Sequence, residues 1–294
     1  DDVFQQTRMW DSIIYNHLKK KNIVVPPIQK HKKDAAYVGA YVKDPQVGMH
    51  KWVASFDLNS LYPHLIMQFN ISPEMLVEPH QYTDAMKSIV LSSSNEVDDL
   101  LMGRIDTSRL TNESVTLTPN GQFFRIHKQG FLAEIMESMY NDRTVYKKKS
   151  IEAKKDLEKE TDPVKRVEIE KRIARYNNLQ LAKKVGLNSA YGALGSQYFR
   201  FYDLRMALGV TSAGQLSIRW IEGKINEYMN KILETNSDYV IASDTDSIYL
   251  NLGPLMDKFI QQPKSIEETI SIMDKICEDK IQPYIDRSYS ELAS

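Results

Sequence analysis

Two acidic residues stand at a tight junction between strand-like runs. Asp244 and Asp246 flank Thr245, between the β-prone residues 239–242 and 248–250. Residues i and i+2 of a strand point to the same side, and two carboxylates held that close repel each other unless a proton or a cation lies between them. Mg²⁺ or Mn²⁺, which prefer oxygen ligands, would relieve the repulsion. A polar turn without any function is the alternative for so short a motif.

A third acidic residue, Asp57, ends the strand-like run 52–56. Three acids at the ends of adjacent strands could hold two metal ions about 4 Å apart, an arrangement that stabilises the attacking and leaving oxygens of a phosphoryl displacement. Taken alone, Asp57 also fits an acidic residue at the start of a helix. Together the acids predict a metal-dependent phosphoryl-transfer site.

Basic residues of a long charged segment supply the complementary charge. Arg143 and Lys147 are spaced i,i+4 on one helix face, and Lys184 lies near the end of a second helix. In an antiparallel helical hairpin the start of the first helix adjoins the end of the second, so we expect these cations to converge. Such a set suits a triphosphate bridged by metal ions. A solvated charged face is the alternative, and it describes the other lysines of the segment.

Hydrophobic spacing and turn residues indicate the elements that must position these groups. Helices are expected at 10–21, 60–69, 96–101, 131–160, from 163 toward 187, 211–233 and 266–280. Strands are expected at 37–42 and 52–56, hairpins around 119–121 and 243–247, and a glycine-containing bend at 191–195. The two long helices are joined by so short a turn that they must fold back antiparallel. The fold class is therefore α+β with an inserted helical hairpin that projects as an arm.

Composition bounds the class of protein. The 294 residues carry 38 Lys and Arg against 39 Asp and Glu, a net charge of -1, with 42% hydrophobic residues. These values exclude a disordered tail, a collagen-like chain and a strongly charged binding protein. The single cysteine, Cys277, excludes a disulfide framework and indicates a reducing compartment. The sequence shows no membrane-length apolar run and no secretory leader.

Four motifs, in the expected order, resemble those of family B DNA polymerases. Residues 55–63 resemble motif A (D-x-x-S-L-Y-P), and residues 184–192 match motif B (K-x-x-x-N-S-x-Y-G). Residues 244–247 match motif C (D-T-D-S), and residues 37–40 resemble the Y-x-G-G/A motif. Each motif is weak to moderate alone, whereas the ordered set is specific. Further segments resemble the replicative polymerases of T-even-type bacteriophages: 10–14, 201–205 and 285–287.

The resemblance implies a role for each matching residue at the metal centre. Asp57 and Asp246 would ligate two Mg²⁺ ions, with Mn²⁺ as a substitute, and the backbone carbonyl of Leu58 would add a ligand. Asp244 would be a supporting acid near the primer 3′ end. One metal would activate the primer 3′-OH for attack on the α-phosphate of a dNTP, and the second would neutralise the leaving pyrophosphate.

The resemblance also implies a set of nucleotide- and DNA-binding residues. The dNTP would be held by Ser60, Leu61, Tyr62, Arg143, Lys147, Lys184 and Asn188. Tyr62 would stack under the sugar and exclude a 2′-OH. Tyr191, beside Gly192, would pack against the nascent base pair, although a tyrosine covering a bend is an alternative. Tyr37 and Gly39 would follow the template strand, where close approach of the backbone explains the glycine.

The family's architecture gives the expected domains. The palm would comprise residues 1–129 and 189–294, and the fingers residues 130–188. The exonuclease and amino-terminal domains are expected before residue 1 and the thumb after residue 294, so the fragment alone would be weakly active or inactive. The implied function is DNA-directed DNA polymerase. The implied partners are primer-template DNA, dNTP and, through regions outside the chain, a sliding clamp, in the cytoplasm of an infected bacterial host and without a membrane.

Two other classes of protein remain open from the residues. A metal-dependent glycosyltransferase could use the D-T-D motif to hold a nucleotide-sugar diphosphate, but it would need neither Tyr62 nor the cationic arm. A non-catalytic nucleic-acid-binding module is the other alternative, and the presence of all three acids argues against it. Primer extension with Mg²⁺ and four dNTPs distinguishes these classes.

Overall fold

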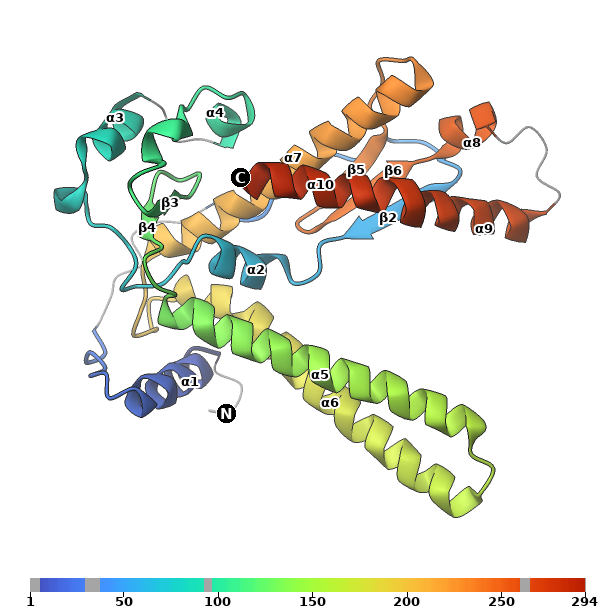
Figure 1. Ribbon diagram of the computed structural model, residues 1–294, viewed down its shortest axis with the longest axis horizontal. Coiled ribbons are helices and arrows are strands. Elements are labelled where there is room, and N and C mark those ends of the chain that lie inside the picture. The colour runs from blue at the N-terminus through green and yellow to red at the C-terminus, as the bar shows by residue number, and fades with distance from the viewer. Residues whose placement is uncertain (1–5, 30–37, 93–96, 260–264, 294) are drawn as a thin grey trace. The chain divides into compact units, whose positions relative to one another are not determined.

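The computed structural model describes residues 6–29, 38–92, 97–259 and 265–293 (Figure 1). The chain forms two compact units. Unit 1 comprises Asp1–Val38, Ser60–Glu96 and Ile105–Val210, and unit 2 comprises Gly39–Asn59, Val97–Arg104 and Thr211–Ser294. Helices and antiparallel strands occur in both units, which confirms the α+β class. In the described part of the chain, no helix has the length and apolar composition to cross a membrane.

Unit 1 is mainly helical. Its elements are α1 (Gln6–Lys20), α2 (Leu61–Gln68), η2 (Pro79–Gln81), α3 (Asp84–Ser92), η3 (Thr107–Leu110), β3 (Val115–Leu117), β4 (Phe123–Arg125), α5 (Phe131–Lys159), α6 (Pro163–Leu194) and the first residues of α7 (Leu204–Leu233). The expected hairpin forms between β3 and β4, with Gly121 at φ 77° in its turn. The unit's core gathers Trp10, Phe124 and Leu187 from distant parts of the sequence.

Helices α5 and α6 form the expected antiparallel hairpin (Figure 1). The Asp162 carboxylate accepts a hydrogen bond from the Val164 N–H at 2.9 Å, and Pro163 occupies the first helical position, where its missing N–H is tolerated. Helices α1 and α2 pack on the base of this hairpin. The buried Trp10 indole N–H donates to Ser189 Oγ at 3.0 Å, so α1 is tied directly to the motif B segment of α6.

The expected bend at residues 191–195 is wrong. Helix α6 continues through Tyr191 and Gly192 to Leu194, and Gly195 is its C-cap. The helix persists because Ala190, Ala193 and Leu194 on one side are almost fully buried in the core of unit 1. Burial outweighs the modest cost of glycine in a helix.

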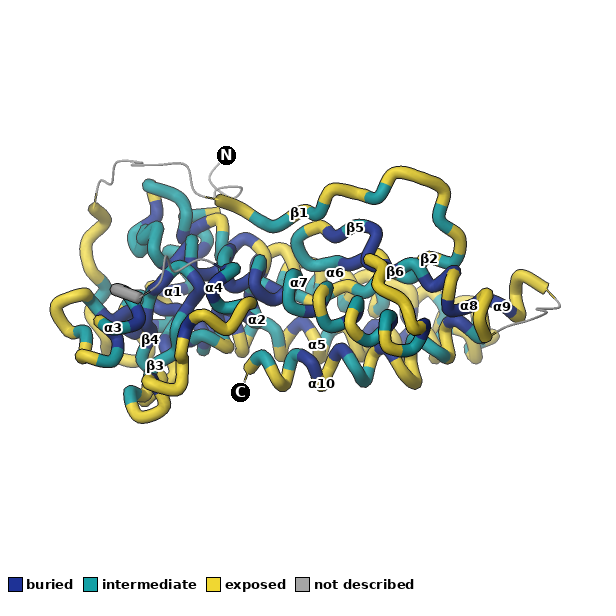
Figure 2. The backbone as a smooth tube through the Cα atoms, turned by 90° about the horizontal axis from the view of Figure 1, so that it is seen from above, coloured by how far each residue is buried: buried dark blue, intermediate teal, exposed yellow. Residues whose placement is uncertain are grey.

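Unit 2 packs helices against an antiparallel sheet. Its elements are β1 (Val42–Lys43), β2 (Val53–Asp57), α4 (Val97–Leu101), the remainder of α7, β5 (Val240–Asp244), β6 (Ser247–Asn251), α8 (Gly253–Phe259), α9 (Ile266–Ile276), the π-helical turn η4 (Cys277–Ile281) and α10 (Gln282–Ala293). The strand order is β1-β5-β6-β2. Ile248 and Leu250 face the helices and are buried, whereas Asp57, Asp244 and Tyr249 are exposed. Figure 2 shows how buried and exposed stretches alternate along the chain.

Two further expectations need correction. The strand expected at 37–42 is reduced to Val42–Lys43 among the described residues, and the chain before it is held mainly by side chains. The final helix was expected to end near Lys280, but it continues through η4 and α10 to Ala293. Pro283 has no N–H to donate, and the wider π turn that precedes it accommodates the missing hydrogen bond.

The compact units do not follow the expected domain limits. Helix α1 belongs to the same unit as α5 and α6, and the boundary between the units passes between Asn59 and Ser60, inside the motif A segment. Helix α7 contributes to both units, with the boundary at Val210. The assignment of palm and fingers stays a prediction.

Candidate active site

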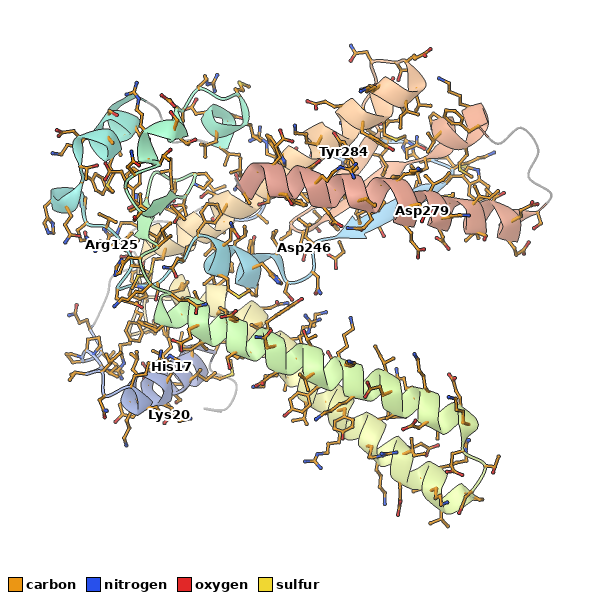
Figure 3. All side chains as sticks on the ribbon, in the orientation of Figure 1. His17, Lys20, Arg125, Asp246, Asp279 and Tyr284 are labelled. Carbon is orange, nitrogen blue, oxygen red and sulfur yellow. The ribbon has the colours of Figure 1, made fainter. Side chains whose placement is uncertain are left out.

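The acidic residues lie at one end of the sheet in unit 2. Asp57 on β2 and Asp244 on β5 are both opposite Ser247 on the intervening strand β6. The Leu58 N–H donates to the Asp246 carbonyl at 2.7 Å, so the end of β2 is bonded directly to the turn that joins β5 and β6. Asp246 is labelled in Figure 3. The register of the sheet therefore brings the backbones of the three acidic positions together, as the sequence predicted.

The turn between the two motif C acids has an unusual backbone. Thr245 adopts φ 54°, a left-handed conformation that is uncommon for a β-branched residue. Its N–H donates to the Tyr41 carbonyl at 3.0 Å, and the Asp246 N–H donates to the Asp244 carbonyl at 2.6 Å. The Thr245 hydroxyl donates to the Asp244 carboxylate at 2.9 Å. These contacts fix the direction in which the two acids leave the turn.

The acidic residues supply the donor chemistry for hard divalent cations. Asp57 and Asp244 are exposed and Asp246 is partly exposed, so carboxylate oxygens are accessible at the end of the sheet, and such oxygens suit Mg²⁺ or Mn²⁺. Among the residues that the structure describes, no three His, Cys, Asp or Glu side chains are grouped closely enough to hold a metal ion. The donor types and the backbone placement fit binding of such cations, although the described side chains form no group of three ligands.

The register of the α5–α6 hairpin places the predicted triphosphate cations. The Lys183 ammonium contacts the Asp142 carboxylate at 2.7 Å, which sets these two residues level with each other. Arg143 directly follows Asp142, and Lys184 directly follows Lys183. Arg143 and Lys184 therefore lie within about one helical turn of each other along the hairpin. Lys147 is one turn farther toward the tip. Lys147 and Lys184 are exposed, as binding of an anion from solvent requires.

Arg143 bonds to the start of α2. Its guanidinium Nη1 donates to Ser60 Oγ at 2.9 Å, and Arg143 is 8% exposed. Ser60 is the N-cap of α2, with φ 56°, and Leu61 is the first residue of the helix. Backbone N–H groups at a helix start favour anions. The predicted phosphate-binding residues Arg143, Ser60 and Leu61 are therefore adjacent in unit 1.

The two predicted tyrosines are neighbours. The rings of Tyr62 on α2 and Tyr191 on α6 have centroids 4.8 Å apart and planes tilted by 47°. One turn before Tyr191 on α6, Asn188 is exposed, and so is Gly192 just after it. The structure thus joins the motif A and motif B residues predicted to surround the sugar and base.

The predicted template segment is described in part. Tyr37 lies outside the described residues. Gly39 does not have a left-handed backbone, and a Cβ atom added to it would meet none of the described residues beyond its chain neighbours within 4 Å. Contacts with the described residues therefore do not require glycine at this position.

Sequence reasoning missed one side chain beside the predicted phosphate site. His64 Nδ1 is 2.9 Å from the Ser60 carbonyl oxygen, and the His64 ring packs edge-on against Tyr140 with centroids 4.5 Å apart. Its position four residues after Ser60 on a predicted helix was the available signal. The tertiary contact with Tyr140 could not be inferred from spacing.

The predicted site residues fall into two sets by unit. Asp57, Leu58, Asp244 and Asp246 belong to unit 2, whereas the cations, Ser60 and the two tyrosines belong to unit 1. Each set is assembled within its own unit by the contacts described above.

Comparison with known proteins decides the family. The sequence model of DNA polymerase family B matches residues 3–283. The chain belongs to this family. As a family B polymerase it is 31% identical to the DNA-directed DNA polymerase of Escherichia phage RB69 and 30% identical to that of Enterobacteria phage T4, in each case over 99% of the chain. It is 28% identical, over 82% of the chain, to the DNA polymerase delta catalytic subunit of Candida albicans.

These comparisons confirm the resemblance found in the motifs, including its bacteriophage character. The family B polymerase chain spans about a third of the two phage relatives, 35% of each, and 20% of the Candida albicans subunit. The matched length thus corresponds to one part of the longer relatives.

Proposed function

We propose that this chain carries the nucleotidyl-transfer site of a DNA-directed DNA polymerase, which joins a dNTP to a primer 3′-OH. The single observation that carries the proposal is the bonded junction of motifs A and C, where the Leu58 N–H donates to the Asp246 carbonyl at 2.7 Å. It holds Asp57 and the Asp244–Asp246 turn at one end of the sheet, as a centre for phosphoryl transfer needs.

The chain's own residues would act by position and charge. Asp57, Asp246 and the Leu58 carbonyl would hold divalent cations, with Asp244 as a supporting acid. When bound, Mg²⁺ or Mn²⁺ lowers the pKa of an attacking hydroxyl and neutralises charge on the phosphates. Arg143, Lys147 and Lys184 would bind the triphosphate together with Asn188 and the amides of Ser60 and Leu61.

The rings on α2 and α6 would select the sugar and align the base pair. The Tyr62 ring centroid lies 4.8 Å from that of Tyr191, so the Tyr191 ring restrains one side of Tyr62. The opposite side of the Tyr62 ring would exclude a 2′-OH. Tyr191 with Gly192 would face the nascent base pair, and Tyr37 with Gly39 the template.

In architectural terms, we assign the sheet of unit 2 to a polymerase palm and the α5–α6 hairpin to the fingers. Rotation of the hairpin on nucleotide binding would bring its cations to the triphosphate and expel water. Primer-template DNA and dNTP are the proposed ligands, and a sliding clamp would bind through regions outside this chain.

Primer extension by the full-length protein tests the proposal. We expect Asp246→Ala to reduce Mg²⁺-dependent extension by at least about a thousandfold, because it removes a carboxylate that holds charge at the reacting phosphate. Affinity for primer-template DNA should remain measurable. The matched control is Asp257→Ala, which removes an exposed acid on α8 of the same unit and should leave extension detectable. Extension that survives Asp246→Ala would refute the assignment.

A further inference from the structure

A polar stripe runs along the side of α7 in unit 2. Gln215, Arg219 and Glu222 follow one another at i, i+4 and i+7, so they lie on one helix face. Along the axis they span about 10 Å. The extended segment 39–43, which enters β1, spans about 13 Å. The two lengths match closely enough for each stripe residue to reach one residue of the segment.

Every second residue of segment 39–43 contacts one residue of the polar stripe on α7. Gln215 Nε2 donates to the Gly39 carbonyl at 2.7 Å, the Arg219 guanidinium lies 5.6 Å from the Tyr41 ring centroid, and the Glu222 carboxylate pairs with the Lys43 ammonium. Arg219 also pairs with Asp98 on α4, which restrains its guanidinium against the ring. Side chains of α7 thus hold a segment that has few backbone ladder bonds of its own.

Lys43 is the strongest of these anchors. Its ammonium contacts Glu222 and, at 2.6 Å, Asp238, and its side chain is 14% exposed. Burial lowers the pKa of Lys43, but its hydrogen bonds to Asp238 and Glu222 outweigh burial and raise it. The lysine is therefore charged at neutral pH, and it ties β1 both to α7 and to Asp238, two residues before β5.

The segment in turn holds the motif C turn. The Tyr41 carbonyl accepts the Thr245 N–H at 3.0 Å, and Val42 is paired opposite Asp244. Thr245 is in a left-handed conformation that persists only when its surroundings fix it. The contact from Tyr41 is made at the residue between the two acids, so displacement of the segment would release the turn.

We infer that Lys43, with Gln215 and Arg219, is a positioning residue for the acidic centre: through segment 39–43 it holds Asp244 and Asp246 in the orientation that divalent cations need. The inference rests on the proposed function and names what positions the same site. It also joins two motifs, because the segment that positions the acids contains Gly39 of the predicted template-binding motif.

A purely structural role for Lys43 would predict something different. Loss of an ion pair would then lower the free energy of unfolding but leave the dependence of the reaction on Mg²⁺ unchanged. Lys224 provides the matched control. It lies on the same helix, is 19% exposed, and pairs with Glu291 on α10 at 3.0 Å, away from segment 39–43.

The experiment compares Lys43→Met, Lys43→Arg and Lys224→Met in the full-length protein. Hydrogen exchange is measured for a peptide covering residues 243–247, and primer extension is measured against Mg²⁺ concentration. We expect Lys43→Met to speed exchange of this peptide about tenfold and to raise the half-saturating Mg²⁺ concentration about tenfold. Lys43→Arg should restore both values in large part, and Lys224→Met should change neither.

Identical behaviour of Lys43→Met and Lys224→Met would overturn the inference. If Lys43→Met does not fold, Gln215→Leu, which removes one hydrogen bond to Gly39, takes its place with the same two measurements and a smaller expected change in the same direction. The Asp246→Ala variant distinguishes failure of the proposed function from failure of the positioning role of Lys43. If it retains extension, the proposed function fails; if it is inactive while the Lys43 variants match Lys224→Met, the positioning role alone fails.

Discussion

At the residue scale, Gly39 is a position where the described part of the chain gives no reason for glycine. Its backbone is not left-handed, and a Cβ atom there would meet none of the described residues beyond its chain neighbours within 4 Å. Gly130 is the opposite case, because a Cβ atom there would lie 2.5 Å from Ser72 Cβ. A glycine-to-alanine substitution at each of these two positions therefore separates effects on ligand binding from effects on folding.

We predict that Gly39→Ala raises the free energy of unfolding by about 0.5 kcal/mol, because the native backbone accepts alanine and the unfolded chain loses freedom. If Gly39 lies against the template as proposed, affinity for primer-template DNA should fall, since the added methyl group would occupy the space of that contact. Chemical denaturation and DNA-binding titrations measure the two effects. Gly130→Ala, as control, should lower stability. Unchanged DNA affinity in Gly39→Ala would remove Gly39 from the template site.

We predict that Tyr62→Ala admits ribonucleotides, because removal of the ring opens the space for a 2′-OH. The ratio of kcat/KM for a dNTP to that for the matching rNTP should fall by at least about tenfold, equivalent to about 1.4 kcal/mol of discrimination. Tyr62→Phe keeps the ring beside Tyr191 and should preserve most of the discrimination. An unchanged ratio in Tyr62→Ala would exclude the steric role.

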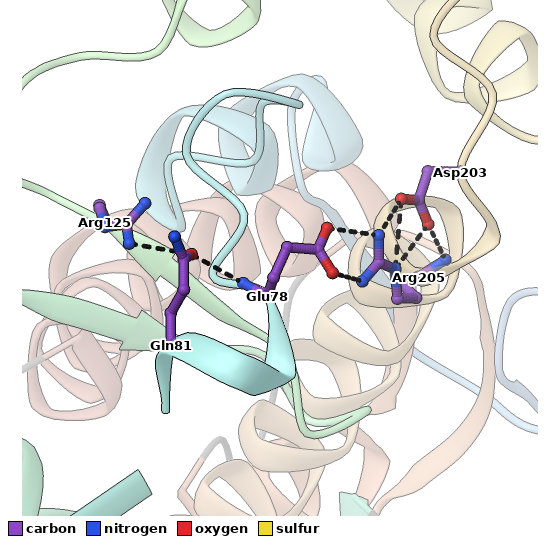
Figure 4. Close-up of polar contacts among 5 residues, drawn as sticks. All are labelled: Glu78, Gln81, Arg125, Asp203 and Arg205. Carbon is purple, nitrogen blue, oxygen red and sulfur yellow. Dashed lines mark hydrogen bonds and ion pairs between the residues drawn. The ribbon is translucent and has the colours of Figure 1, made fainter. Parts of the chain in front are cut away.

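At the element scale, ion pairs join segments that hydrophobic spacing does not connect. In unit 1, Arg205 bonds to Glu78 through two contacts of 2.9 and 3.0 Å and to Asp203 at 2.7 Å (Figure 4). Asp203 also accepts the Arg205 backbone N–H at 2.9 Å, at the first turn of α7. The pair therefore fastens the start of α7 to the residue that precedes η2.

This ion pair gives a prediction about pH. The hydrogen bond from Arg205 holds the pKa of Glu78 below its ordinary value, so the unfolded state binds a proton more readily than the folded state. The stabilisation is present above the ordinary pKa of glutamate and is lost as the pH falls through the lowered pKa. Because the pair is solvent-exposed, we expect Glu78→Gln to cost about 0.5 kcal/mol at pH 7.

Urea denaturation of the parent and of Glu78→Gln at pH 7 and at about pH 3 measures this effect. The difference in the free energy of unfolding should be present at pH 7 and vanish at the lower pH. Glu158→Gln, a substitution at an exposed position of α5, serves as control and should show no such pH-dependent difference. A constant difference for Glu78→Gln at both pH values would contradict the assignment.

Local patterns predicted the elements well and their ends less well. The α5–α6 hairpin follows from spacing and from Asp162-Pro163, and the D-T-D junction follows from its β-prone flanks. The continuation of α6 through Gly192 and of the last helix through Pro283 depended on burial and on a π turn, which periodicity does not encode. Likewise, local spacing could not predict the contacts of Lys43, because its partners are 179 and 195 residues away in the sequence.

At the scale of the whole molecule, the net charge of -1 conceals a separation of charge. The acids Asp57, Asp244 and Asp246 belong to unit 2, and the cations proposed to bind the triphosphate belong to unit 1. If one Mg²⁺-bound nucleotide is held by both sets, residues of different units become energetically coupled through it. Residues without a shared partner usually have additive effects, so coupling between the two sets of residues is a direct sign of a shared ligand.

We predict such coupling between Lys147 and Asp246. In a double-mutant cycle with Lys147→Ala and Asp246→Asn, dNTP affinity is measured in the complex with a 3′-dideoxy-terminated primer-template, so that no reaction occurs. Under the proposed function the coupling energy should be about 1 kcal/mol or more, because both charges would act on the same triphosphate. The matched control is Lys148→Ala, since Lys148 is equally exposed on α5 but turned by about 100° around the helix, and its cycle with Asp246→Asn should be additive. Additivity in both cycles would mean that the cations of the arm and the acids of the sheet do not share a nucleotide, and the two sets of residues would then have to serve different ligands.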